Sequence, residues 1–133
     1  AVALEEDRLG TAVIHAAAVS DFRPKRTSTT KIPSGHKITL KLVPVPKLIN
    51  RIKWILPEVF LVGFKLESTD SEKKFLQASA KLIEEAGCDV VVANSVAGGY
   101  KAALINGQKK IIARARSRQD VSLKLTKILR EAL

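Results

Sequence analysis

The sequence predicts an α/β fold with a mostly parallel sheet, followed by a C-terminal β-hairpin and helix. Three observations support this prediction. Short apolar runs alternate with stretches of helical periodicity along the chain. The first runs are apolar throughout, which is typical of strands buried on both faces of a parallel sheet. Near the C-terminus, an Asn-Gly pair separates two strand-like stretches and indicates a hairpin.

The first expected strand covers residues 11–19 (TAVIHAAAV), an apolar run between Gly10 and Asp21. Residues 20–36 are polar and contain prolines and a glycine, so we expect a loop there. This loop is longer than the usual ~4–6 residues, and long ordered loops often carry function.

Residues 37–43 (KITLKLV) alternate polar and apolar side chains, which is the pattern of a half-exposed strand. Prolines end this stretch. A helix is expected over residues 47–56, and a second buried strand over residues 59–66.

The next helix is expected to begin at Asp70 as its N-cap and to end at Gly87. A third buried strand is expected over residues 89–93 (DVVVA). The helix carries an apolar stripe that is expected to face the sheet, made of Phe75, Leu76, Ala80, Ile83 and Ala86.

The hairpin is expected to pair residues 100–105 with residues 108–113 through a type I′ turn at Asn106-Gly107. Ser117 and Asp120 resemble a capping box at the start of a last helix. The apolar stripe of that helix is Val121, Leu125, Ile128, Leu129 and Ala132.

Length and composition restrict the class of protein. The 133 residues suit a single domain, 1–133. The lone Cys88 excludes a disulfide within the chain and favours a reducing cytoplasm. No apolar run approaches the ~20 residues that cross a bilayer, so no membrane partner is expected.

The net charge of +10 is compatible with a solvated basic surface, a site for phosphorylated small molecules, or a nucleic-acid partner. Nucleic-acid modules usually add interleaved aromatic side chains or a recognition motif. Here aromatic residues are only 5% of the chain and the lysines are dispersed, so the composition disfavours a nucleic-acid partner without excluding one.

In parallel sheets, ligands bind beyond the carboxyl ends of the strands. This rule predicts that residues 19–21, residues 64–67 and Asn94 lie at one edge of the sheet. Basic groups at such an edge suit phosphate binding. The small side chains of residues 16–18 let a ligand lie close to the backbone, or simply pack under a helix. The polar side chains of the region are Ser20, Asp21, Arg23, Lys31, Lys65, Glu67 and Asn94.

Other kinds of site find little support. There is no Walker loop, and the glycine pair at residues 98–99 precedes a hairpin instead of opening a helix, unlike a dinucleotide fingerprint. His15 and His36 lack partners at metal-ligand spacing, so no protein metal site is expected. The residues by themselves therefore predict an α/β domain that binds a phosphorylated small molecule.

Five segments, in order along nearly the whole chain, resemble the signatures of phosphopantothenoylcysteine synthetase. They are HAAAVSDFRP at 15–24, KIPS at 31–34, VPKLI at 45–49, VGFKLE at 62–67 and DVVVAN at 89–94. Each motif alone is weak, but five in order and at familiar spacing make a strong joint signal.

The resemblance implies a ligase that forms 4′-phosphopantothenoylcysteine from 4′-phosphopantothenate and cysteine through an acyl-nucleotide intermediate, in coenzyme A biosynthesis. The co-substrate is CTP or ATP, used with Mg²⁺, and the sequence leaves the choice open. The family is dimeric, and in bacteria and archaea it is commonly fused behind a flavin-dependent decarboxylase. A homodimer and such a fusion are therefore expectations.

The resemblance also implies a three-layer, Rossmann-like fold whose N-terminal part is missing here. The family's glycine-rich strand-turn-helix and asparagine loop have no counterpart in these residues. We therefore expect a partial synthetase domain that is incomplete as a catalyst.

Carried over residue by residue, the resemblance places Lys31 at the nucleotide phosphates as the catalytic candidate and Asn94 at the substrate. The other residues placed at the nucleotide are Ala16, Ala17, Ala18, Asp21, Phe64 and Lys81.

Two other functions stay open. One is a non-catalytic α/β domain for nucleotide binding or oligomerisation, and the other is a basic nucleic-acid-binding domain. Nucleotide turnover, nucleotide binding without turnover, and salt-dependent binding of nucleic acid separate the three functions.

Overall fold

The structure is a computed structural model that describes residues 10–133. The chain forms two compact units. Unit 1 contains residues 49–133 together with the chain up to Ala16, and unit 2 is Ala17–Leu48. The prediction of one partial domain over residues 1–133 stays a prediction.

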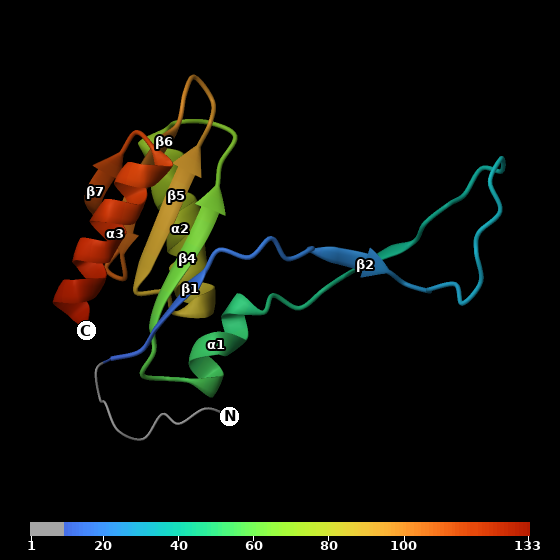
Figure 1. Cartoon of the computed structure of the whole chain (residues 1–133), viewed down its shortest axis with the longest axis horizontal. Coiled ribbons are helices and arrows are strands. Elements are labelled where there is room, and N and C mark those ends of the chain that lie inside the picture. Colours follow the sequence, from blue (N-terminus) through green and yellow to red (C-terminus); the bar gives the residue numbers. More distant parts are fainter. Residues whose placement is uncertain (1–9) are drawn as a thin grey trace. The chain divides into compact units, whose positions relative to one another are not determined.

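Unit 1 is built on a five-stranded sheet (Figure 1). Strands β1, β4 and β5 are parallel neighbours, and β6 runs antiparallel to both β5 and β7. All strands of this sheet except β6 therefore point the same way, which confirms the predicted α/β fold with its C-terminal hairpin and helix. In sheet order the strands are β1 (Ala12–His15), β4 (Phe60–Leu66), β5 (Val90–Ser95), β6 (Lys101–Asn106) and β7 (Ile111–Ala115).

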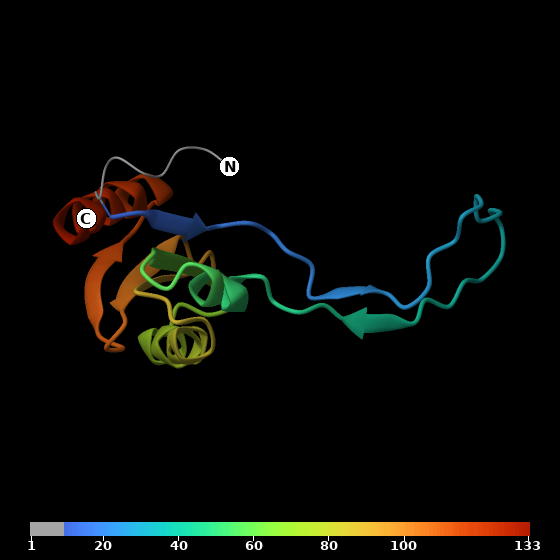
Figure 2. The same ribbon diagram turned by 90° about the horizontal axis from the view of Figure 1, so that it is seen from below.

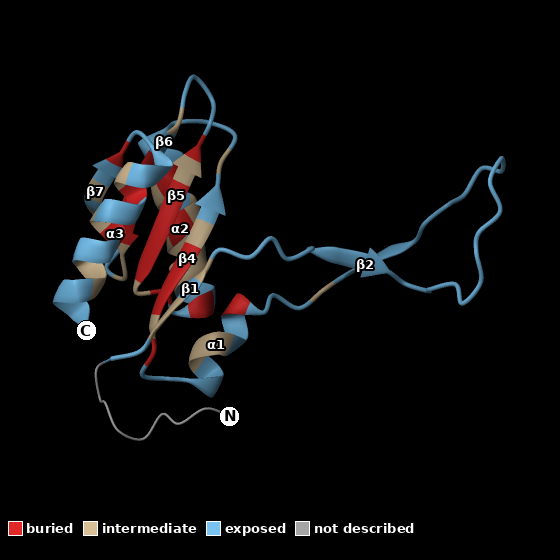
Figure 3. Ribbon diagram, viewed as in Figure 1, coloured by how far each residue is buried: buried red, intermediate tan, exposed pale blue. Residues whose placement is uncertain are grey.

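Helices cover the two faces of this sheet and make three layers (Figure 2). Helices α1 (Ile49–Ile55) and α2 (Glu72–Ala86) lie on one face, and α3 (Arg118–Ala132) lies on the other. In β4, Leu61 belongs to the core under α1 and α2, whereas the next residue, Val62, belongs to the core under α3. The middle strands are buried on both faces (Figure 3), which explains their unbroken apolar runs.

The ends of α2 and α3 test the capping residues that the sequence predicted. Gly87 ends α2 in the left-handed conformation at φ 70°, and its N–H donates to the Ile83 carbonyl, as predicted. The Ser117 side chain accepts from the N–H of Asp120 at 3.0 Å, as predicted for α3. The prediction of Asp70 as the N-cap of α2 is wrong, since Ser71 holds that position.

Asp70 has a different partner. Its carboxylate forms an ion pair with Lys101 at the start of β6, and this contact lowers the pKa of Asp70. Asp70 therefore binds Lys101, 31 residues away in the sequence, instead of capping α2 as the local pattern predicted.

The hairpin between β6 and β7 is present, but the predicted type I′ turn is wrong. The N–H of Lys109 donates to the Asn106 carbonyl, and Lys109, instead of Gly107, has a positive φ of 64°. The Asn106 side chain accepts from the N–H of Lys110 at 3.0 Å. These bonds close a loop of three residues with a left-handed last residue, in place of a two-residue turn.

Two strand predictions need correction. The strand expected at residues 11–19 ends at His15, its last residue paired with β4. The strand expected at 37–43 is wrong, because only Leu42–Pro44 forms a strand, β3. It pairs antiparallel with β2 (Phe22–Pro24), which lies inside the expected loop. Alternation over a few residues does not specify a pairing partner, and the observed ribbon in unit 2 is short.

One buried residue of α2 was missed. The expected stripe contained Ala80, but Ser79 is the fully buried neighbour that faces the sheet with Phe75. Its hydroxyl has no hydrogen-bond partner among the described residues. A buried hydroxyl without a partner costs free energy relative to one in water.

We therefore expect Ser79→Ala to raise the free energy of unfolding by about 1.5 kcal/mol, since it removes this hydroxyl and improves helix propensity. Urea denaturation would measure the change. Ser122→Ala is the control. Ser122 is exposed on α3, so only the propensity gain of about 0.5 kcal/mol is expected there. A lower stability for Ser79→Ala would show that the hydroxyl finds a partner in solution.

Candidate functional site

The carboxyl ends of β4 and β5 meet at one edge of the sheet in unit 1. Leu66 is the register partner of Asn94, and the N–H of Glu67 donates to the Asn94 carbonyl at 2.8 Å. This arrangement confirms that residues 64–67 and Asn94 share an edge, as the parallel topology predicted.

A cavity of about 370 Å³ lies on the α3 face of the sheet and reaches this edge. Its volume is in the range of sites for small molecules. Phe64 from β4 and Asn94 from β5 both line it, so the structure brings these two predicted site residues together. The other lining residues are Ile14, Tyr100, Arg118, Val121, Ser122, Leu125, Thr126 and Leu129.

Tyr100 and Arg118 are cavity residues that the sequence did not indicate. The guanidinium carbon of Arg118 lies 5.4 Å from the centre of the Tyr100 ring, a cation–π contact. Burial raises the pKa of the Tyr100 phenol, so this group stays protonated at neutral pH. Tyr100 precedes β6 and Arg118 begins α3, and only the packing of α3 on the hairpin makes them neighbours.

The chain turns sharply between β5 and β6. The buried Ser95 side chain accepts from the N–H of Ala97 at 3.1 Å. Gly98 and Gly99 have φ values of 67° and 103°, which glycine adopts without strain. The glycine pair thus makes the turn into β6, so its predicted position in front of the hairpin is confirmed.

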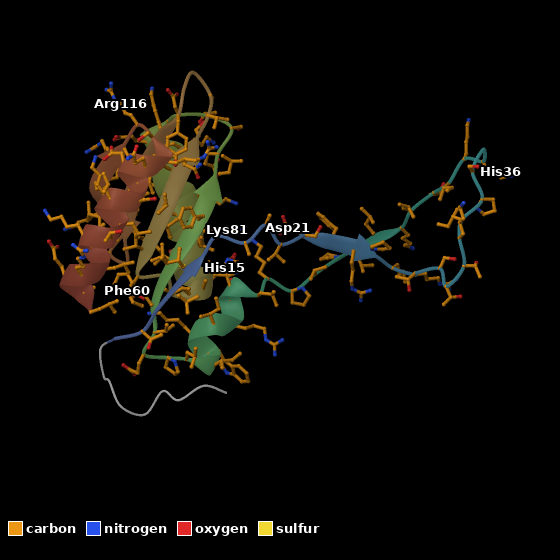
Figure 4. The ribbon with its side chains drawn as sticks, in the orientation of Figure 1. His15, Asp21, His36, Phe60, Lys81 and Arg116 are labelled. Carbon is orange, nitrogen blue, oxygen red and sulfur yellow. The ribbon has the colours of Figure 1, made fainter. Side chains whose placement is uncertain are left out.

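Lys81 lies on α2, the helix that covers the face opposite the cavity (Figure 4). Its side chain is 72% exposed and forms an i,i+4 ion pair with Glu85 at 3.9 Å. Within unit 1, the structure therefore does not place Lys81 beside Phe64 and Asn94. Its role at the nucleotide stays a prediction.

The remaining predicted site residues are exposed. Ala16 ends the first segment of unit 1, and Ala17, Ala18, Asp21 and Lys31 belong to unit 2. The Asp21 carbonyl accepts from the N–H of Val45 at 2.9 Å and so holds the base of the β2–β3 ribbon. The roles of these residues at a nucleotide stay predictions.

The histidines and the lone cysteine of the chain do not line the cavity of unit 1. Among residues 10–133, no group of three or more His, Cys, Asp and Glu side chains is arranged to hold a metal ion. His15 lies on β1 and His36 in unit 2 (Figure 4). Burial raises the pKa of the Cys88 thiol to about 11, so this side chain packs as a neutral thiol. No helix in the described part of the chain is long and apolar enough to span a bilayer.

A mostly parallel sheet between helical layers defines an open α/β domain, and its cavity lies at the carboxyl ends of the strands, where such domains commonly bind ligands. Residues 3–130 match the family model described as DNA/pantothenate metabolism flavoprotein C-terminal domain, and the chain belongs to this family. The family predicted from the five motifs is thereby confirmed.

Curated relatives carry one name, Coenzyme A biosynthesis bifunctional protein CoaBC. The protein from Thermococcus kodakarensis is 52% identical over 84 residues, which is 63% of this chain and 21% of that protein. The protein from Mycobacterium tuberculosis is 32% identical over 95 residues, 65% of this chain and 23% of that protein. The match thus spans less than a quarter of each relative's length.

Solved structures share the fold. The DNA/pantothenate metabolism flavoprotein from Streptococcus pneumoniae superimposes with a TM-score of 0.79 at 21% identity, covering 92% of this chain and 64% of that one. A Cab2 mutant in complex with phosphopantothenate-cysteine gives a TM-score of 0.55 at 23% identity, covering 78% and 37%.

Proposed function

We propose that this chain is part of a phosphopantothenate–cysteine ligase that forms 4′-phosphopantothenoylcysteine in coenzyme A biosynthesis. The family match over residues 3–130 is the observation that carries the proposal. The 52% identity to a protein named for coenzyme A biosynthesis adds to it. The five sequence segments that resemble the synthetase lie within the same matched residues.

The proposed reaction has two steps. The carboxylate of phosphopantothenate attacks the α-phosphorus of CTP or ATP, forming an acyl-nucleotide and releasing pyrophosphate. The cysteine amine then attacks the acyl carbon, and the nucleoside monophosphate leaves. Both steps build negative charge on oxygen atoms, so fixed cations and N–H donors lower their barriers.

Residues of this chain supply groups of the required kinds. In unit 1, Phe64 offers an aromatic face in the cavity and Asn94 an amide that can donate and accept hydrogen bonds. In unit 2, Lys31 offers an exposed ammonium for phosphate. Mg²⁺ would be held mainly by phosphate and water oxygens and would supply positive charge to the triphosphate.

We also propose a fused decarboxylase and a cytoplasmic location for this protein. The relatives are named bifunctional, in agreement with fusion to a flavin-dependent decarboxylase. A cytoplasmic location is proposed because the chain's lone cysteine is a free thiol, which suits a reducing compartment.

Isothermal titration of the 133-residue chain should detect binding of CTP or ATP, while pyrophosphate release with phosphopantothenate and cysteine stays near background. The physical reason is that these residues include no counterpart of the asparagine loop that holds the acyl-nucleotide. A longer polypeptide with that loop should restore turnover. Binding of neither nucleotide would contradict the ligase proposal, and rapid release by the 133 residues would contradict the proposed incompleteness.

In an active synthetase that carries this chain, Lys31→Ala should lower the turnover number on the order of 100-fold, the usual effect of losing one electrostatic donor to the transition state. The melting temperature should stay unchanged, because Lys31 is exposed. Lys37→Ala, at another exposed lysine of unit 2, is the control. Equal turnover by the two variants would show that Lys31 is only surface charge.

A homodimer is also proposed, on the basis of an apolar face in unit 2. Phe22 and Pro24 of β2 lie opposite Pro44 and Leu42 of β3, and cross-strand partners share a face of the ribbon. Phe22 is 56% exposed and Leu42 is 52% exposed. A two-stranded ribbon is marginally stable alone, and a second copy would cover this face.

Leu42→Asp should therefore shift the mass measured by light scattering from dimer to monomer, because a carboxylate in the covered face would lose its hydration. Leu123→Asp makes the same chemical change on α3, where the side chain is 66% exposed, and should leave the dimer intact. A monomer mass for the unaltered chain at all concentrations would refute the dimer.

A further inference from the structure

Unit 2 carries most of the chain's excess positive charge. It contains seven Lys and Arg residues and one acidic residue, Asp21, which leaves a net charge of +6 out of the chain's +10. The β2–β3 ribbon divides its side chains by face. Phe22 and Pro24 point to the apolar face, and the alternate residues Arg23 and Lys25 point to the opposite face.

The cations gather around a hollow of about 350 Å³ just beyond the paired residues of the ribbon. Its lining contains three cationic side chains, Lys25, Arg26 and Lys41, together with the hydroxyl of Thr39. Pro24 and Leu40 complete the wall, and no acidic or aromatic side chain from residues 10–133 contributes to it.

The backbone holds two of these cations opposite each other. The N–H of Lys25 donates to the Lys41 carbonyl at 2.8 Å, so these residues are cross-strand neighbours. Like charges directly opposite each other destabilise a ribbon. Within residues 10–133, none of the ion pairs includes Lys25, Arg26 or Lys41. Among the described residues, no ion pair therefore compensates this repulsion.

We propose that this hollow is a binding site for the phosphate groups of a small-molecule di- or triphosphate. Arg26 provides a planar fork that matches two phosphate oxygens, and the lysines provide compact charges. Thr39 provides a neutral hydroxyl donor. The described part of the wall has no aromatic ring on which a base could stack, so the proposed site recognises the phosphate chain and not the base.

The proposal is argued from unit 2 alone and goes beyond the ligase function. The position of Lys25, Arg26 and Lys41 around the hollow is its basis, whereas the ligase proposal depends on the family match and on other residues. The binding of a phosphate chain can accordingly be measured without any turnover.

The test is a calorimetric titration of the 133-residue chain with inorganic tripolyphosphate, carried out at low and at physiological ionic strength. Saturable binding is expected, weakening as salt screens the charges. The double variant Arg26→Ala/Lys41→Ala should weaken the affinity at least about 10-fold, because two of three cations are lost. CTP should lose a similar factor in the same variant if its phosphates occupy the hollow.

Lys74→Ala/Lys127→Ala is the matched control. Both lysines are exposed on helices of unit 1, and the control removes the same net charge, so tripolyphosphate affinity should stay within about 2-fold. Circular dichroism would verify that unit 1 is folded in both variants.

Three outcomes would overturn the site. One is the absence of tripolyphosphate binding, and another is an equal loss in the control variant, which would indicate net charge alone. The third is binding of a single-stranded oligonucleotide that tripolyphosphate does not displace, which would indicate a nucleic-acid partner. If tripolyphosphate binding fails while pyrophosphate release by a longer active form persists, only this site is refuted and the ligase proposal stands.

Discussion

The close approach of two helices to β4 at Gly63 is the constraint on which unit 1 depends. A Cβ atom at this position would lie 2.9 Å from both the Sγ of Cys88 and a methyl carbon of Leu82, and 3.2 Å from a methyl carbon of Ile49. Helix α1, helix α2 and the residue that leads into β5 thus all converge on one backbone point. The next residue, Phe64, faces the other side of the sheet and lines the cavity. Gly63 thus allows close packing of the helices on one face of the sheet, and the adjacent Phe64 lines the cavity on the other face.

Asp89 connects the same elements by polar contacts. Its carboxylate accepts from the N–H of Leu61 at 2.7 Å and lies 2.7 Å from the ammonium of Lys53 on α1. Both side chains are partly exposed, so the ion pair itself contributes little. The hydrogen bond to the backbone matters more, because it joins the second residue of β4 to the residue before β5 and so supports the register of the two strands. That register brings Asn94 to the carboxyl edge beside Leu66.

The two units differ in how far they bury their apolar side chains. Unit 1 buries apolar side chains on both faces of its sheet and reaches a packed core. In unit 2 the apolar side chains of the ribbon stay exposed, and its cations lie close together. Under the proposals above, such a segment gains stability from what it binds, either a second copy on the apolar face or phosphate in the hollow beside Lys25, Arg26 and Lys41. Because unit 2 does not bury these side chains in a core of its own, they remain exposed and can contact a partner or a ligand.

The sequence by itself determined the family, the buried strands β4 and β5, and the ends of α2 and α3 at Gly87 and Ser117. The family is visible in five motifs in order along the chain. The strands and helix ends depend on residues within about one helical turn or on a continuous apolar run, and both are visible in the order of residues. Tertiary structure alone decided the pairing of β2 with β3, the ion pair that drew Asp70 from the start of α2, and the meeting of Tyr100 with Arg118. Each of these brings together residues 18 or more positions apart in the chain. Such contacts form only where packing of whole helices and strands lowers the free energy enough to offset the entropy of closing the intervening loop.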